Sequence, residues 1–381
     1  MKRIAAVLTA FCLMASCAWA EIQTMNERVD RVFRDTRAVG GAFVVAQKGE
    51  IVYERYYGVQ QKTTGVPVTE KSYFRCASVT KLVTGMGLMK MMDEGLLDPD
   101  EDISTYLGYE VRNPRFMDQP ITLRHLMSHT AGLNEGASYN RKSSLLSEMI
   151  AVDQKARANF KEAAPGSSYA YSNFGAGITG SIIESVTGQD VSSYMRENFF
   201  APLGIDAAYT ATQIEEPEYL TATYHKDGSL YASPSYMLRQ EYVQQAMPDQ
   251  HYRVTVGSLL IRPRDLTRLG IALCGDGTVD GVRIISEKAR SMMLEERDSD
   301  GITEDSPYRF FTIKQDTLLD GRSVYGHQGT DDGVVANLYV EPESETVFCV
   351  MTNGCKSNRD DGIMRITRRL VEIAEEVYLK N

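Results

Sequence analysis

Alternating hydrophobic and polar positions predict β-structure towards both ends of this chain. Residues 41–47 and 50–57 alternate on either side of Lys48-Gly49, which is the pattern of a β-hairpin. Further β-rich segments occur late in the chain, at residues 308–314, 334–340 and 346–351, and a Pro-Glu-Ser-Glu turn separates the last two. Strands at both ends with a different pattern between them predict one antiparallel sheet assembled from both parts of the chain.

A period of 3.6 residues predicts helices elsewhere. Between Ser78 and Gly95 the apolar residues fall on one helical face, and residues 26–37 and 363–379 have amphipathic patterns. Thr122 is placed to cap a short helix that runs through His125, and Gly188 is placed to end another. Up to about residue 250 the signals stay mainly helical, with Pro- and Gly-rich loops between them.

These patterns together predict an α+β fold with two lobes. The sheet lobe is expected to contain about residues 26–76 and 255–381, with the two terminal helices covering one face of the sheet. The helical lobe is expected to be an insertion of about residues 77–254. Active sites often lie where two lobes meet, so we expect the functional residues at this boundary.

The first 20 residues have the pattern of an export signal. Lys2 and Arg3 precede an apolar stretch, residues 4–15, that is too short to span a bilayer. Ala18-Trp19-Ala20 is a cleavage site, so a mature domain of residues 21–381 is predicted outside the cytoplasm, without an integral membrane span. A lipid anchor on Cys17 is a minor alternative, because Met14-Ala15-Ser16-Cys17 only approximates a lipoprotein cleavage site.

Composition excludes several classes of function. The 381 residues carry a net charge of −10 and contain no dense basic run, which argues against a nucleic-acid partner. Four cysteines follow the predicted leader, and they lack the spacing of a disulfide scaffold or a zinc site. Cys349 and Cys355 are close enough in sequence to pair, which stays open, whereas Cys76 is expected to be a small core residue. We expect no metal and no cofactor.

Ser78 and Lys81 form a Ser-x-x-Lys motif at the start of a predicted helix. Residues at i and i+3 share one helical face, so their side chains are neighbours. A serine hydroxyl becomes a good nucleophile when a base takes its proton, and lysine is that base only when its surroundings lower its pKa. The helix N-terminus also directs backbone N–H groups towards developing negative charge. The spacing alone is weak evidence, because serine and lysine are both common.

Two later motifs occur in a fixed order after it. Tyr171-Ser172-Asn173 follows a Pro-Gly turn, and His327-Gln328-Gly329 lies just ahead of a predicted strand. Together with residues 74–77 and 122–133, these motifs resemble the serine β-lactamase-related superfamily: class C β-lactamases, DD-carboxypeptidases, D-aminopeptidases and related esterases. The resemblance extends from about residue 27 to the C-terminus and implies a β-lactamase/transpeptidase-like fold.

The resemblance also implies a role for each motif residue. Ser78 is expected to form an acyl-enzyme, Lys81 to act as its base, and Tyr171 to share the proton transfers. Asn173 is expected to hydrogen-bond Lys81 and a substrate amide, and the N–H groups of Ser78 and Thr330 to form an oxyanion hole. The implied substrate-binding residues are Asn173, His327, Gly329 and Thr330.

His327 departs from the β-lactamase pattern, in which a lysine usually stands. Lysine is a permanent cation for a substrate carboxylate, whereas histidine is mostly neutral above its usual pKa of ~6.5. We therefore expect an exported hydrolase of DD-peptidase or esterase type that cleaves an amide or ester of a small molecule or peptide. The alternatives are a weak class C-like β-lactamase and a penicillin-binding sensor that does not turn over. The oligomeric state is not predicted.

Other patterns were given structural interpretations. The G-x-G-x-x-G at residues 175–180 lacks a preceding strand, so we expect small residues at a helix contact. His125 and His129 have metal-ligand spacing without the glutamate of a zinc-protease motif, so a capping or supporting role is expected. Three loop residues, Arg239, Tyr242 and His251, could line the substrate pocket or be solvated, and solvation is the favoured interpretation.

Overall fold

The computed structural model describes residues 22–136, 139, 145–152, 154–295, 303 and 306–380. The predicted leader of residues 1–20, with the possible anchor at Cys17, lies outside them. Within the described part of the chain, no helix has the length and apolar character that crossing a membrane requires.

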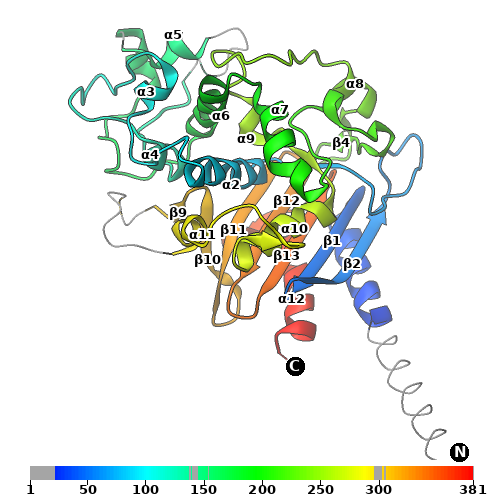
Figure 1. The fold of residues 1–381 in the computed structure, drawn as a ribbon. Coiled ribbons are helices and arrows are strands. Elements are labelled where there is room, and N and C mark those ends of the chain that lie inside the picture. Colours follow the sequence, from blue (N-terminus) through cyan, green and yellow to red (C-terminus); the bar gives the residue numbers. More distant parts are fainter. Residues whose placement is uncertain are drawn as a thin grey trace, which may run out of the picture.

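A seven-stranded antiparallel sheet contains strands from both ends of the chain, as predicted. The strands lie in the order β2-β1-β13-β12-β11-β10-β9, and the pairing of β1 with β13 joins the two parts (Figure 1). Their bounds are β1 Gly40–Gln47, β2 Glu50–Gly58, β9 Tyr308–Arg309, β10 Thr312–Leu319, β11 Arg322–Asp331, β12 Val334–Glu341 and β13 Thr346–Thr352.

Each face of the sheet is buried by helices, because successive side chains of a strand point to opposite faces. Val44 of β1 belongs to a core shared with α2 (Val79–Asp93) and α10 (Pro263–Cys274). Its neighbour Val45 belongs to a second core, formed with the helix of residues 22–35 and α12 (Arg365–Tyr378). The two terminal helices therefore cover one face of the sheet together, as expected from the sequence.

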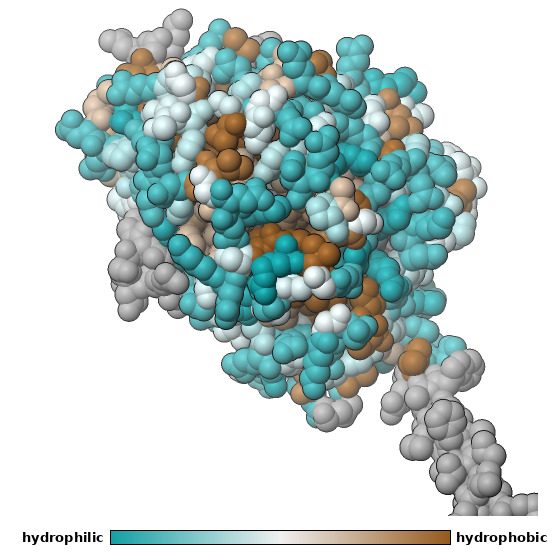
Figure 2. Space-filling view, in the orientation of Figure 1, coloured by the Kyte–Doolittle hydropathy of each residue, from teal (hydrophilic) through white to brown (hydrophobic). Residues whose placement is uncertain are grey.

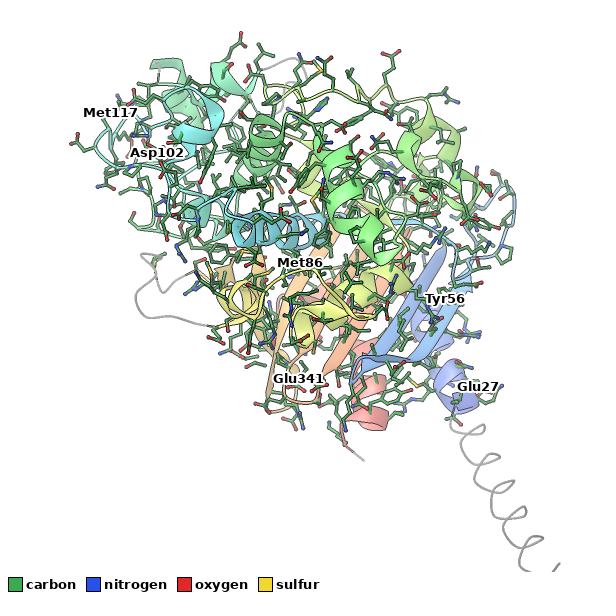
Figure 3. The ribbon with its side chains drawn as sticks, in the orientation of Figure 1. Glu27, Tyr56, Met86, Asp102, Met117 and Glu341 are labelled. Atoms are coloured by element: carbon green, nitrogen blue, oxygen red, sulfur yellow. The ribbon has the colours of Figure 1, made fainter. Side chains whose placement is uncertain are left out.

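The helix α2 lies between the sheet and the helices of residues 103–195 (Figure 1). Met86, labelled on α2 in Figure 3, is completely buried at this boundary. The helices of the second lobe and its surroundings are α3 Ile103–Leu107, α4 Leu123–Met127, α5 Leu146–Ile150, α6 Asn173–Thr187, α7 Val191–Met195, α8 Pro234–Leu238, α9 Val254–Gly257 and α11 Glu287–Leu294. Short two-stranded pairs complete the fold: β3 Phe74–Arg75 with β6 Leu260–Ile261, β4 Thr223–Tyr224 with β5 Leu230–Ala232, β7 Thr278–Val279 with β8 Val282–Arg283, and β14 Arg359–Asp360 with β15 Ile363–Met364. Figure 2 shows one face as mostly hydrophilic, with hydrophobic side chains gathered in a few small areas.

Several local expectations are confirmed. Thr122 caps α4, where the His125 ring accepts a hydrogen bond from the Thr122 N–H and completes a capping box. The small residues of α6 allow close helix packing: a Cβ on Gly177 would lie 2.0 Å from the carbonyl oxygen of Tyr252. Cys349 and Cys355 are both buried free thiols, which settles the pairing that the sequence left open.

Three expectations need correction. The strand expected at residues 308–314 is two strands, because Phe310 and Phe311, with positive φ angles of 46° and 63°, form a turn after which β10 pairs back on β9. His327 does not precede a strand but lies within β11. His251 is not a solvated loop residue: it is buried, and its ring is bonded to the carboxylate of Glu184 at 2.6 Å.

Candidate active site

Ser78 stands at the N-terminus of α2, with its hydroxyl left free for chemistry. It is the N-cap residue by position, yet its side chain makes no capping hydrogen bond. The preceding residue, Ala77, has a φ of 44°, which is unusual for a residue with a Cβ. Strained backbone of this kind persists where surrounding contacts enforce it, and it is common at functional sites. The turn sets Ser78 on the wall of a pocket of about 610 Å³.

Lys81 lies one helical turn further along and is completely buried. Its Nζ is 3.1 Å from Ser78 Oγ and 2.6 Å from the carbonyl oxygen of Val256, a residue of α9. Burial lowers the pKa of Lys81 from 10.5 to about 7, although the negative charge of Glu135 partly opposes this shift. A substantial fraction of Lys81 is therefore neutral at neutral pH and able to accept a proton.

The strand β11 touches the backbone of Cys76 and Ser78. A Cβ on Gly329 would lie 2.4 Å from the carbonyl oxygen of Cys76 and 2.8 Å from the backbone nitrogen of Ser78. This close approach explains why glycine occupies the third position of the His-Gln-Gly motif. It also brings Thr330, which follows Gly329, to the same pocket as Ser78.

Tyr171 reaches the site from the segment before α6. Its ring lies under the Lys81 ammonium group, with 5.4 Å between Nζ and the ring centroid, and its hydroxyl is hydrogen-bonded to Ser78. Although 37% of the residue is exposed, desolvation raises the pKa of the phenol above its usual value of 10.0. The phenol is consequently protonated at neutral pH. His129 packs against this ring with 4.3 Å between centroids.

Asn173 is bonded differently from what the resemblance implies. Its backbone N–H and its side-chain amide both donate to the carboxylate of Glu135, the latter at 3.4 Å. In the described residues the Lys81 ammonium group bonds Ser78 and Val256, not Asn173. Asn173 still lines the same pocket as Ser78 and Tyr171.

His327 is buried and cannot serve as a cation in this site. Burial lowers its pKa to about 3, and the nearby charge of Lys81 adds to the shift. Its Nδ1 lies 2.7 Å from the carbonyl oxygen of Gln328, while its buried Nε2 has no hydrogen-bond partner among the described residues. The imidazole is therefore a neutral part of the pocket wall at neutral pH.

Five of the predicted residues, Ser78, Tyr171, Asn173, His327 and Thr330, line one cavity of about 610 Å³, and Lys81 is buried behind Ser78. An ion pair joins Arg75 to Asp331 at its edge, with 2.5 Å between the charged atoms, and the Arg75 Nε also donates to the carbonyl oxygen of Gly257. The lining comprises Arg75, Ala77, Ser78, Tyr169, Tyr171, Asn173, Val256, Gly257, Tyr308, Ile313, Gln315, His327, Gln328, Thr330, Asp331, Arg359 and Gly362. Gly329, by contrast, supports the wall from behind through its contact with Cys76.

Two contributors to the site carry no motif and were missed from sequence. Glu135 lies in a loop, where an isolated acidic residue gives no functional signal, yet its carboxylate holds the N-terminus of α6. Val256 acts through its carbonyl oxygen, which every residue possesses.

A comparison with protein-family models decides the relationship, because the model named Beta-lactamase matches residues 25–373. This chain belongs to the beta-lactamase family. Residues of all three of its motifs line one pocket.

Curated relatives agree with this membership, and a solved structure has a similar fold. Esterase EstB of Burkholderia gladioli is 30% identical over 64% of this chain, and the match spans 62% of the esterase's own length. Penicillin-binding protein 4 of Amycolatopsis lactamdurans is 27% identical over 86% of this chain and 84% of that protein. The fold resembles D-amino acid amidase from Ochrobactrum anthropi SV3 in complex with D-phenylalanine, with a TM-score of 0.69, 20% identity and coverage of 93% of this chain and 99% of the amidase.

Proposed function

We propose that this family member hydrolyses an ester or amide through an acyl-enzyme on Ser78. The observation that carries the proposal is the buried Lys81, whose Nζ lies 3.1 Å from Ser78 Oγ and whose pKa is lowered to about 7. A neutral amine at this distance is a suitable base for the serine hydroxyl.

In the proposed first step, Ser78 Oγ attacks the substrate carbonyl carbon while Lys81 takes the hydroxyl proton. The carbonyl oxygen becomes an oxyanion, which we assign to the backbone N–H groups of Ser78 and Thr330. The close contact between Gly329 and the Ser78 backbone supports this pairing. When the carbon–oxygen or carbon–nitrogen bond breaks, the leaving group needs a proton. Tyr171 is suited to supply it, because its phenol is protonated at neutral pH and bonded to Ser78.

Deacylation reverses these roles with water as the nucleophile. Water adds to the acyl carbon, gives up a proton to the base, and Ser78 leaves with its hydroxyl restored. The phenoxide of Tyr171, formed when it protonates the leaving group, is the nearest base for that water until Lys81 returns a proton to it. No metal or cofactor is needed for either half of the cycle.

A DD-peptidase or esterase type of substrate is proposed, rather than a β-lactam. The neutral His327 gives a substrate carboxylate no fixed charge at this position, which supports an uncharged ester over an anionic β-lactam; the peptidase type is supported by the names of the relatives. The relatives have matching names, among them D-alanyl-D-alanine-carboxypeptidase/endopeptidase AmpH of Escherichia coli K12, which is 28% identical over 60% of this chain. We also propose export from the cytoplasm, on the pattern of residues 1–20.

Labelling and turnover test the proposal together. A fluorophosphonate is expected to add once to the mature protein, at Ser78, and Ser78→Ala is expected to remove both the label and the hydrolysis. Ser167→Ala, which removes an exposed hydroxyl bonded only to Ala164, is the matched control. p-Nitrophenyl acetate, a D-Ala-D-Ala peptide and nitrocefin then separate esterase, peptidase and β-lactamase activity. Full hydrolysis by Ser78→Ala contradicts the proposal, and a label that substrate esters leave permanently on Ser78 indicates a sensor.

A further inference from the structure

A second cavity of about 330 Å³ lies beside the catalytic pocket. The β4–β5 pair and α8 form its outer wall, and residues 209–211 form its floor. Its lining comprises Arg75, Tyr209, Thr210, Ala211, Thr223, Tyr231, Ala232, Tyr236, Met237, Gln240, Glu241, Tyr242, Val254, Ser258 and Leu260. We call it the aromatic pocket, after its four tyrosines.

The two pockets share a wall. Arg75 lines both, held in place by Asp331 on one side and by the carbonyl oxygen of Gly257 below. Along the α9 segment, Val256 and Gly257 face the catalytic pocket, while the flanking residues Val254 and Ser258 line the aromatic pocket. The two cavities are therefore adjacent at the Arg75 side chain, within reach of a single extended substrate.

The lining favours an uncharged, apolar group. Tyr231 and Tyr236 expose about half of their surface, 55% and 48%. Exposed aromatic surface is unfavourable in water, so an apolar ligand that covered these two rings would be stabilised there. The charge of Arg75 is already paired with Asp331, and Glu241 would repel an anion. Thr223 adds one polar group to the lining. The residue is 2% exposed, and its hydroxyl has no hydrogen-bond partner among the described residues.

We propose that the aromatic pocket is a specificity subsite that binds a ring-sized apolar group of the Ser78 substrate. The inference rests on the proposed function, because it assigns part of the same substrate. A cavity of about 150 Å³ holds benzene, so the aromatic pocket accommodates a phenyl ring with its connecting carbon atoms. That group belongs either to the acyl part or to the leaving part of the substrate. In both cases the group that enters the pocket is an apolar ring.

Paired esters and paired variants test this subsite. p-Nitrophenyl phenylacetate is compared with p-nitrophenyl acetate for the acyl side, and benzyl acetate with methyl acetate for the leaving side. Tyr236→Ala is expected to lower kcat/KM about tenfold for the phenyl-bearing ester of one pair, without changing its small partner. Leu238→Ala, on the same helix, with 36% exposure and outside the lining, is the matched control and is expected to change neither. Ala232→Leu, which fills the cavity, is expected to reproduce the selective loss.

The opposite results have distinct meanings. The subsite is disproved, while the proposed function stands, if the phenyl group raises kcat/KM of the wild-type protein in neither pair of esters. The same conclusion follows if Leu238→Ala lowers kcat/KM as much as Tyr236→Ala does. If the wild-type protein hydrolyses no ester, the pocket is judged by binding, and the proposed function fails only when the D-Ala-D-Ala peptide is also left intact. Saturation-transfer NMR with phenylacetamide is expected to show contact in the wild-type protein that Ala232→Leu abolishes. Equal signals from both proteins overturn the subsite.

Discussion

The carbonyl oxygen of Val256 accepts a hydrogen bond from Lys81 Nζ at 2.6 Å, which ties the catalytic amine to α9. A neutral amine has two N–H donors and one lone pair. Because one N–H is directed at Val256, the amine is held in place with its lone pair free to face Ser78 Oγ, 3.1 Å away. This backbone contact thus orients the base as well as satisfying one of its donors.

The first prediction concerns the pH dependence of hydrolysis. Lys81 has to be neutral to act as a base, and its pKa is about 7, so kcat/KM is expected to rise with pH and level off above about 8. His327 has a pKa of about 3 and does not titrate in this range. Ester hydrolysis measured from pH 5.5 to 9 checks this, and His327→Asn is expected to keep the same midpoint. A midpoint that disappears in His327→Asn contradicts the assignment to Lys81.

The second prediction concerns Glu135, whose charge favours the protonated form of Lys81. Glu135→Gln removes that charge but keeps an oxygen to accept from the Asn173 N–H. The midpoint of the pH profile is therefore expected to move to lower pH, by roughly half a unit to one unit. Glu162→Gln, at an exposed ion pair with Arg115, is the matched control. An upward shift contradicts the electrostatic role of Glu135.

The third prediction is that the catalytic amine destabilises the fold. Between pH 7 and 10.5 the unfolded chain binds more protons at Lys81 than the folded chain, so the free energy of unfolding rises with pH across this interval. Below pH 7 both states are protonated, and the folded state carries the full cost of a buried charge. Lys81→Met is expected to abolish activity yet raise the free energy of unfolding at pH 6 by about 1–2 kcal/mol. Urea denaturation at pH 6 and pH 10 checks this, and a destabilised variant at pH 6 contradicts it.

The fourth prediction concerns the contact between β11 and the nucleophile. Gly329→Ala places a Cβ against Cys76 and Ser78, and a shift of about 1 Å in a catalytic group costs about 100-fold in rate. We therefore expect kcat to fall at least 100-fold while circular dichroism shows a folded protein. Gly175→Ala, where the nearest atoms are 3.5 Å away or more, is expected to retain activity. Equal activity of the two variants would show that the close contact is unimportant for catalysis.

Much of the architecture could be predicted because its signals are local. The β1–β2 hairpin follows from alternation around a turn, and α2 follows from a helical period that begins at Ser78. The strand β11 was missed because polar residues of the site, including His327, interrupt its pattern. The break at Phe310-Phe311 was equally invisible, because aromatic residues favour strands and their positive φ angles are imposed by tertiary contacts.

The residues of the candidate site could be predicted from the sequence, whereas their environment could not. Ser78, Lys81 and Tyr171 were identified by ordered motifs, and the structure places them in contact. The environment that gives them chemical character is nonlocal: the pKa of Lys81 depends on burial and on Glu135, and no sequence window contains both influences. The partner of Asn173 was predicted incorrectly for that reason, because Glu135 comes from a loop without a motif.

The sheet that unites both ends of the chain also sets when catalysis begins during synthesis. Gly41 pairs with Thr352, so the sheet cannot close until nearly the whole polypeptide has been made. Ser78 emerges early, whereas Thr330, its proposed oxyanion partner, emerges late. Pairing between such distant segments is slow relative to local helix formation. A nascent chain that already contains the nucleophile is therefore inert, and the onset of hydrolysis marks the moment when its two ends have met.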